Sequence, residues 1–367
     1  MKKFWRVAGW TGLALALLLG FAAYRILWGK PFTLNELANR QAIMLLIDNP
    51  ELFTQVGIAD GTIFDRHSGK LAAVGVAKRD ADYAMAARFL AELKRFDRAK
   101  LDRKDQITYD VLADQYETAL AFRRFDWLSS EGLYPISPMF GTQVQLASFM
   151  LSAHVVRNEK TARNYVKRLE AMGDKLDALT AEMQRQAGAG VVLPGSLLEK
   201  SELVIRDTIK APPEHNALVT SFVERMNQAK GLDAGLKHEL AEAAVAALTA
   251  HVYPAYERMT AALEALKPQA AAQSAGVDRL PDGAAYYAVA LRQMTTTDYS
   301  PDKVHALGLA EVARISAEMD ALLKSQGMTE GSIAARMQAL TKDPRFLFPN
   351  TDDGRKQALA RYQQILD

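Results

Sequence analysis

Apolar residues recur at helical spacing along almost the whole chain beyond Lys30. The 3.6-residue period is clearest in residues 81–96, with apolar side chains at positions 83, 86, 87, 90 and 93, and in residues 105–122. No alternating pattern of convincing strand length appears, and Val191–Leu193 forms a short strand at most. The pattern therefore predicts an all-α, multi-helix fold.

Capping residues, glycines and prolines set the expected limits of the helices. Thr33 and Glu36 have the spacing of a capping box, and Ser300 followed by Pro301 marks a further helix start. Other helices are expected at 161–186, 194–210, 213–230, 233–266 with a kink at Pro254, 300–327, 332–340 and 352–366, and loops at 60–69, 129–141 and 267–278.

The N-terminus has the pattern of a membrane element. Val7–Tyr24 contains 18 residues without a charge, three basic residues precede it, and its extension to Trp28 makes it long enough to span a bilayer. The preceding charges predict a single-pass inner-membrane protein, held through residues 7–28, with its C-terminal domain in the periplasm. The alternative is a signal peptide that is cleaved, with secretion into the periplasm.

The charge balance and the absence of cysteine exclude several classes of function. Residues 1–30 hold five basic residues and no acid, so the remainder carries −3 of the total formal charge of +2. No clustered basic face of the kind that binds phosphates is indicated, and nucleic acid is not an expected partner. Without cysteine, disulfides, thiolate nucleophiles, cysteine metal sites and a lipidated-cysteine anchor are all excluded.

Residues 238–242, His-Glu-Leu-Ala-Glu, come nearest to a zinc motif. In HExxH the two histidines share one face of a helix and the glutamate activates the metal-bound water, but here the fifth residue is Glu242. The competing and favoured interpretation is an exposed helix start, where acidic residues suit the helix dipole. Residues 295–298 are likewise interpreted as a loop after a helix and not as a nucleophile cluster.

The segments LPDGAAYYAVALRQMTTTD and SPDKVHALGLAEV, within residues 280–315, resemble the bacterial family named domain of unknown function 885. The resemblance extends from about Thr33 to the last residue. That family is similar to helical zinc metallopeptidases of the HExxH type, which implies a two-lobed, channel-forming helical fold. It also implies a zinc-bound water as the nucleophile and a glutamate as the base.

The family's metal signature, roughly HExxPGHH, lies beyond the segments that match and is absent from this chain. We therefore expect no catalytic residue, no metal site and no cofactor within these residues, with zinc only in a C-terminal part. The resemblance implies that Tyr286, Tyr287 and His305 contact substrate in a cleft. The alternative is structural: the tyrosines fill core, His305 packs near a helix start, and Glu311 pairs with Arg314 or Arg292.

The expected organisation is a membrane anchor or signal segment in residues 1–30 followed by a helical domain in residues 31–367. Two hypotheses follow: an N-terminal portion of a metallopeptidase-like protein, or a complete, non-catalytic helical binding or scaffold protein of the cell envelope. The first predicts a missing C-terminal lobe, or a peptide substrate, as partner. It also predicts that two helices expose apolar residues, namely Ala306, Leu307, Leu309, Ala310 and Ile315, and Leu359, Tyr362, Ile365 and Leu366.

Overall fold

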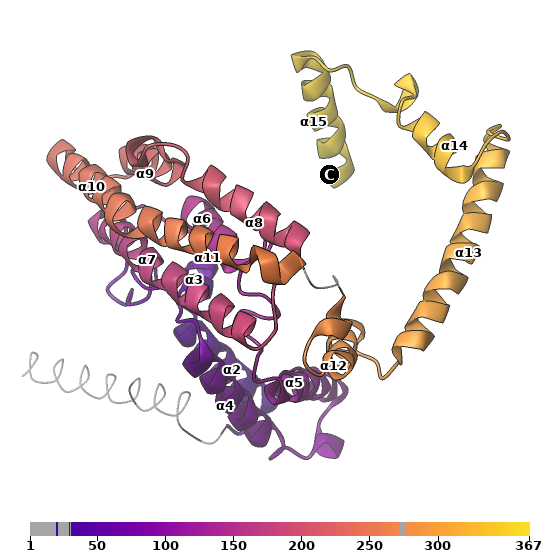
Figure 1. Ribbon diagram of the computed structural model, residues 1–367, viewed down its shortest axis with the longest axis horizontal. Helices are drawn as coiled ribbons and strands as arrows, with labels where there is room; N and C mark the ends of the chain where they lie inside the picture. Colours follow the sequence, from indigo (N-terminus) through magenta and orange to yellow (C-terminus); the bar gives the residue numbers. More distant parts are fainter. Residues whose placement is uncertain (1–19, 21–28, 30, 272–275) are drawn as a thin grey trace, which may run out of the picture. The chain divides into compact units, whose positions relative to one another are not determined.

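The computed structural model describes residue 20, residue 29, residues 31–271 and residues 276–367, and within them the chain is all-α (Figure 1). The described part contains no β-strand, and its one isolated bridge joins Ser129 to Gly132. Val191–Leu193 is therefore loop, which corrects the one strand candidate. The predicted membrane span in residues 7–28 lies outside the described residues. Within the described ones, no helix combines the length and apolarity needed to cross a bilayer.

Residue contacts divide the chain into two units, residues 1–296 and residues 297–367. The α-helices of the first unit are α2 Leu34–Asp48, α3 Pro50–Val56, α4 Val76–Leu93, α5 Arg103–Ala121, α6 Thr142–Ser152, α7 Glu159–Gly188, α8 Gly195–Thr208, α9 Ala217–Gln228, α10 Ala234–Ala247, α11 Tyr253–Ala271 and α12 Gly283–Thr295. The second unit contains α13 Pro301–Ser325, α14 Ile333–Leu340 and α15 Asp352–Leu366.

The capping residues, glycines and prolines predicted most helix ends to within a few residues of their observed positions. The hydroxyl of Thr33 accepts the N–H of Glu36, as in a capping box, while the Glu36 carboxylate accepts the N–H of Phe32. Ser300 caps α13 with Pro301 in its first turn, as predicted. One expectation is wrong: residues 267–271 continue α11 instead of starting a linker, with Pro268 inside the helix.

The kink predicted at Pro254 takes the form of a change in helix type. The chain runs from α10 into α11 through a π-helical turn, Leu248–Val252, in which Tyr253 donates its N–H to the carbonyl of Leu248. Proline has no N–H to continue the α-helical ladder. The wider turn directly before it absorbs the interruption without ending the helical run.

Helix α7 is the centre of the main core. Its buried face includes Tyr165, Leu169, Leu176 and Leu179, and α6, α10, α11 and the π-helical turn pack against it. A second cluster of aromatic side chains forms around Phe125 and Trp127 next to α12. A third joins α2, α4 and α5 and holds a buried hydrogen bond from the Tyr116 hydroxyl to the side chain of Gln41.

The second unit is built differently, because it has almost no apolar core of its own. Among residues 297–367, all of which the structure describes, Leu323 is the one large apolar residue that is buried. Polar contacts hold α13 to α14: the guanidinium of Arg336 binds the carboxylate of Asp320 and the carbonyl of Met328. This unit therefore leaves most of its apolar side chains without cover from its own residues.

Glycine is required where α7 meets the π-helical turn. A β-carbon on Gly173 would lie 2.8 Å from the carbonyl oxygen of His251. We expect Gly173→Ala to lower the free energy of unfolding in urea by about 1–3 kcal/mol, because backbone must move to admit the methyl group. The matched control is Gly188→Ala at the end of the same helix, where nothing lies within 4 Å and the change gains at most about 1 kcal/mol. Equal effects at both positions would contradict the close approach.

Candidate functional site: a buried histidine between two aspartates

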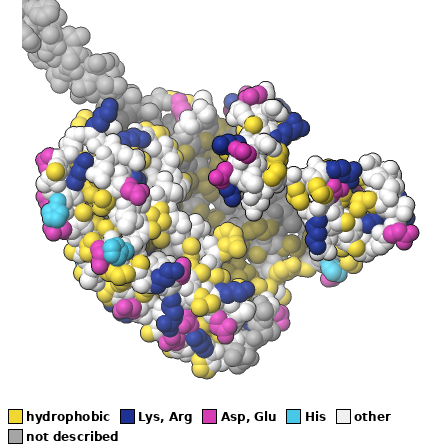
Figure 2. Space-filling model, turned by 90° about the horizontal axis from the view of Figure 1, so that it is seen from above, with side chains coloured by type: hydrophobic (Ala, Val, Ile, Leu, Met, Phe, Trp, Pro, Cys, Tyr) yellow, Lys and Arg dark blue, Asp and Glu magenta, His cyan; other side chains and the backbone are white. Residues whose placement is uncertain are grey.

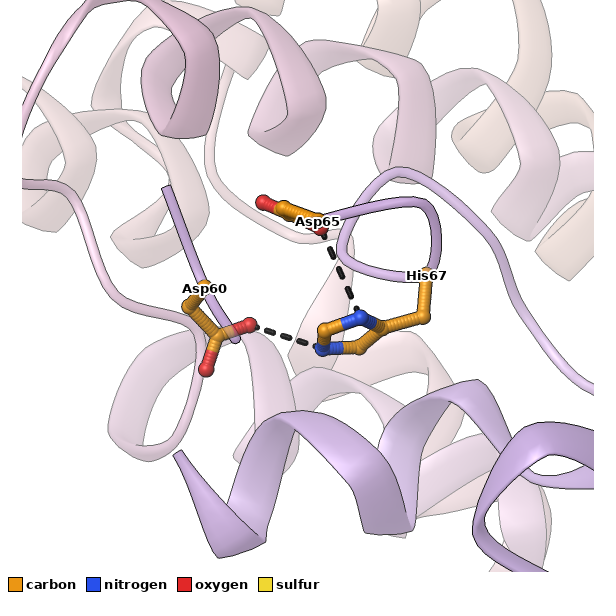
Figure 3. A group of neighbouring side chains, drawn as sticks. All are labelled: Asp60, Asp65 and His67. Carbon is orange, nitrogen blue, oxygen red and sulfur yellow. Dashed lines mark hydrogen bonds and ion pairs between the residues drawn. The ribbon is translucent and has the colours of Figure 1, made fainter. Parts of the chain in front are cut away.

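The loop between α3 and α4 brings three ligand-type side chains together inside the protein (Figure 3). Asp60, Asp65 and His67 are all buried, and one ligand atom from each lies within 4.8 Å of the others. The Nε2 atom of His67 is 2.9 Å from Oδ1 of Asp60, and its Nδ1 atom is 3.5 Å from Oδ1 of Asp65. The imidazole therefore lies between two carboxylates, with one at each ring nitrogen.

Asp65 organises the loop through backbone and hydroxyl donors. Its carboxylate accepts the N–H of Gly61 at 2.8 Å, and the N–H and hydroxyl of Ser68 at 3.0 and 2.6 Å. Asn164 of α7 donates to the Ser68 hydroxyl at 2.7 Å, which joins the loop to the central helix. Burial acts to raise the pKa of Asp65, but the hydrogen bonds from Ser68 and Gly61 outweigh it, and the pKa is lowered.

Aromatic stacking by Phe53 and a hydrogen bond from Asn158, directly before α7, hold the site in place. The ring of Phe53, on α3, stacks on the His67 ring with centroids 4.1 Å apart and planes 15° apart. Asn158, which caps α7, donates to the carbonyl of Gly61 at 3.2 Å. The histidine is therefore fixed in position by packing as well as by its carboxylate partners.

Arg168 of α7 lies directly behind the loop and is fully buried. Its Nε donates to the carbonyl of Lys70 at 2.9 Å, and its Nη2 lies 2.8 Å from the hydroxyl of Thr54 and 3.3 Å from the carbonyl of His67. Burial lowers the pKa of Arg168 to about 10, so the guanidinium keeps its charge at neutral pH.

The remaining contact of Arg168 fixes the tautomer of a second histidine. Its Nη1 lies 2.9 Å from Nδ1 of His154, and Nε2 of that ring lies 3.0 Å from the carbonyl of Thr161. Arginine has no acceptor, so Nδ1 of His154 accepts and Nε2 carries the proton. Burial, followed by the charge of Arg168, lowers the pKa of His154 to about 3, and the ring is neutral at pH 7.

The surroundings of His67 place a carboxylate at each ring nitrogen. Nε2 faces Asp60, and Nδ1 faces Asp65. Buried polar groups need hydrogen-bond partners, and the ring supplies one to Asp60, while Gly61 and Ser68 supply the partners of Asp65.

A metal ion is the other chemistry that this donor set suggests. Oδ2 of Asp60 is buried and has no hydrogen-bond partner among the described residues. However, it points away from the ring, and the two aspartates face opposite nitrogens of the imidazole (Figure 3). One ligand atom from each residue lies within 4.8 Å of the others, so the three could hold a cation. In the structure the imidazole itself lies between the two carboxylates, and Asp60, Asp65 and His67 are called the clasp below.

The two tyrosines that the family resemblance marked for substrate contact lie in different environments. Tyr286 is half-buried on α12 and packs its ring against Phe122, Phe125 and Trp127, with centroids 5.2 to 5.8 Å apart. Burial raises its pKa. Tyr287, the next residue along the helix, is exposed. The two tyrosines thus point to different environments, as adjacent positions on a helix require.

His305 lies exposed on α13, in the second unit. Glu311 pairs with Arg314 at 2.7 Å, which was one of the two expected partners, while Arg292 pairs with Asp114.

The zinc-like segment at residues 238–242 is an exposed helix start, as favoured from the sequence. Its side chains at His238 and Glu242 approach to 3.3 Å but are 76% and 70% exposed, and Asp233 caps the helix.

Sequence reasoning assigned residues 60–69 to a loop and did not find the clasp. The spacing Asp-x4-Asp-x-His within one short loop was the available signal. It could not reveal Arg168 or His154, because those residues reach the loop from α7 and from the segment before it. The clasp depends on contacts between residues about a hundred positions apart, such as Arg168 with His67.

Comparison with known proteins identifies relatives of the fold. A family model described as "Bacterial protein of unknown function (DUF885)" matches residues 50–367. A solved structure, described as a "putative lipoprotein from Colwellia psychrerythraea", superposes with a TM-score of 0.76 at 23% identity over 90% of this chain. The chain spans 58% of the length of that protein. No curated protein sequence matches the chain.

Replacing the histidine of the clasp tests its contacts with the two carboxylates. His67→Phe keeps the stacking on Phe53 but removes the ring nitrogens that face the buried Asp60 and Asp65, and we expect it to cost about 1–3 kcal/mol in urea unfolding. Adding Asp60→Asn and Asp65→Asn should recover part of that loss. The control His238→Ala, at an exposed ring, should change stability by no more than about 0.5 kcal/mol. A large loss of stability of the native chain on treatment with a chelator would instead support a bound cation.

The neutral state of His154 makes folding sensitive to acid. The unfolded state binds the proton near pH 6.5 and the folded state only near pH 3. The contribution of neutral His154 to the free energy of unfolding is therefore complete above pH 6.5. It is lost as the pH falls toward 3, by roughly 1.4 kcal/mol per pH unit. The variant His154→Gln keeps an acceptor for Arg168 and a donor for Thr161. Its unfolding free energy, measured from pH 7 to 4, should fall less steeply than that of the native chain. Parallel curves would contradict the assignment.

Proposed function

The chain belongs to the bacterial family of unknown function DUF885 over residues 50–367, and from that premise we propose that it is the helical framework portion of an exported, membrane-attached protein. In this proposal, residues 297–367 bind further polypeptide, and the hydrolytic chemistry implied by the resemblance to zinc metallopeptidases lies in that polypeptide. Zinc, its activated water and a glutamate base would be supplied there, because this sequence contains no HExxH motif.

The observation that supports the proposal is the exposed apolar surface of α13 and α15. Every position predicted to face a missing lobe is exposed: Ala306, Leu307, Leu309, Ala310 and Ile315 on α13, and Leu359, Tyr362, Ile365 and Leu366 on α15. Apolar side chains are scattered among charged ones on the face shown in Figure 2, which is usual for a protein surface. It is not usual for helices to expose apolar positions along their length while Leu323 is the one large apolar residue buried in residues 297–367.

The family likeness supports further polypeptide as the occupant of that surface. The solved relative is longer, since this chain spans 58% of it. The match covers 90% of this chain, so the additional residues of that protein lie outside the match. Additional residues of this kind could cover the exposed faces of α13 and α15. Of the residues that the resemblance marks for substrate contact, Tyr287 on α12 and His305 on α13 are each exposed, whereas Tyr286 is packed among aromatic rings.

Attachment to the envelope rests on residues 7–28 and on the description of the solved relative as a lipoprotein. This chain contains no cysteine, so a lipid-modified cysteine cannot be its anchor. We therefore propose the uncharged segment itself as the attachment to the inner membrane, with residues from 31 onward in the periplasm. Cleavage of that segment as a signal peptide would leave the same domain free in the periplasm.

Self-association tests the exposed surface. Residues 31–367 in detergent-free buffer should sediment as oligomers at micromolar concentration, because uncovered apolar faces pair with one another. Leu309→Lys with Leu359→Lys should restore the monomer by charging both faces. The control Leu203→Lys, on α8, alters a leucine that is 66% exposed, close to the 69% of Leu359, and should leave the oligomers unchanged.

A cooperative monomer that binds no hydrophobic dye would contradict the proposal. It would favour the alternative of a complete, non-catalytic helical scaffold protein.

A further inference from the structure

We propose that the loop between α3 and α4 carries a second membrane contact, in which its apolar tip inserts into the interface of an anionic bilayer. The apolar tip consists of Val56, the last residue of α3, and Ile58, Ile63 and Phe64 of the loop. This inference goes beyond the proposed framework function and does not depend on what covers α13 and α15.

The apolar tip is among the most exposed apolar surface of the described chain. Ile63 is 84% exposed, Phe64 76% and Ile58 73%, within seven residues of one another. An isolated apolar residue on a surface is ordinary, but several large exposed ones within seven residues of one loop indicate an interaction site. Phenylalanine and isoleucine are also side chains that partition into the boundary between headgroups and acyl chains.

The same loop is held rigidly from behind, so the apolar tip cannot fold inward to cover itself. Asp65, the residue after Phe64, is fixed by its bonds from Gly61 and Ser68. The carbonyl of Gly61 accepts from Asn158, and the carbonyl of Thr62 accepts from Lys160 at 2.7 Å. The buried clasp therefore has a consequence at the surface: it presents these side chains outward in a fixed arrangement.

Three exposed basic residues, called the basic rim, lie on the loop or on the segment that hydrogen-bonds it. Arg66 is exposed two residues after Phe64, and Arg157 and Lys160 are exposed on the segment that hydrogen-bonds the loop. The nearby acid Glu159 is already paired with Arg163 at 2.8 Å.

The apolar tip together with the basic rim complements an anionic lipid surface in both of its properties. Each basic residue near such a surface strengthens binding about fivefold. The occupant that fits this arrangement is therefore the bilayer to which the uncharged Val7–Tyr24 segment is also suited.

The absence of cysteine allows a direct test on the full chain. Single variants Phe64→Cys and Phe140→Cys each receive one environment-sensitive fluorophore without background labelling. Phe140 is the matched control, since it is 75% exposed on a different loop of the same unit. The labelled proteins are mixed with vesicles of phosphatidylglycerol and phosphatidylcholine, or of phosphatidylcholine alone, that carry a quencher in the acyl chains.

We expect a blue shift and quenching at position 64 and neither at position 140. Both effects should be larger with the anionic vesicles than with phosphatidylcholine alone. Adding Arg66→Glu and Lys160→Glu to Phe64→Cys should remove most of the quenching. Equal quenching at both positions would overturn the proposal, because it would reflect attachment through another segment. A blue shift at position 64 that needs no vesicles and grows with protein concentration would overturn it in favour of a second copy of this chain. Neither result bears on α13 and α15, so the two proposals fail separately.

Discussion

A single buried guanidinium organises the first half of this protein. Arg168 is fully enclosed, and each of its three nitrogens has a partner: a carbonyl of the α3–α4 loop, the ring of His154, and acceptors on α3. It also lies over the face of the Phe149 ring, 4.8 Å from the centroid. A buried cation is tolerated only when its donors are satisfied and its charge is balanced. Helix α3, the loop and the start of α7 must therefore hold their observed places together.

The two histidines next to this arginine have different partners. His154 receives a hydrogen bond from a donor that cannot accept, so it is held neutral. His67 lies between two carboxylates, with one at each ring nitrogen. The ring of His154 joins the segment before α7 to that helix, through Arg168 and Thr161. The ring of His67 joins two aspartates of the α3–α4 loop to Phe53 of α3.

The two units of the chain use burial in opposite ways. In the first, long helices enclose α7, and buried polar groups such as Arg168 are paired, so the loops that reach the surface are rigid. In the second, helices keep their shape through caps and ion pairs such as Arg336 with Asp320, while their apolar faces remain exposed. A helix that is held by its own caps and ion pairs, but whose apolar face is exposed, is suited to pack against further polypeptide. That contrast is the basis of the proposed framework role.

The sequence by itself determined the all-α class, most helix limits and the exposed face of α13 and α15. These follow from interactions between residues three or four apart, such as the Thr33 and Ser300 caps, and from the 3.6-residue period. It also placed residues 238–242 correctly on an exposed helix start.

Tertiary structure alone decided the clasp around His67, the neutrality of His154 and the extension of α11 through Pro268. The reason is that burial, protonation and charge balance depend on partners far away in sequence. Arg168 meets His67 across 101 positions, a separation at which no local pattern carries information.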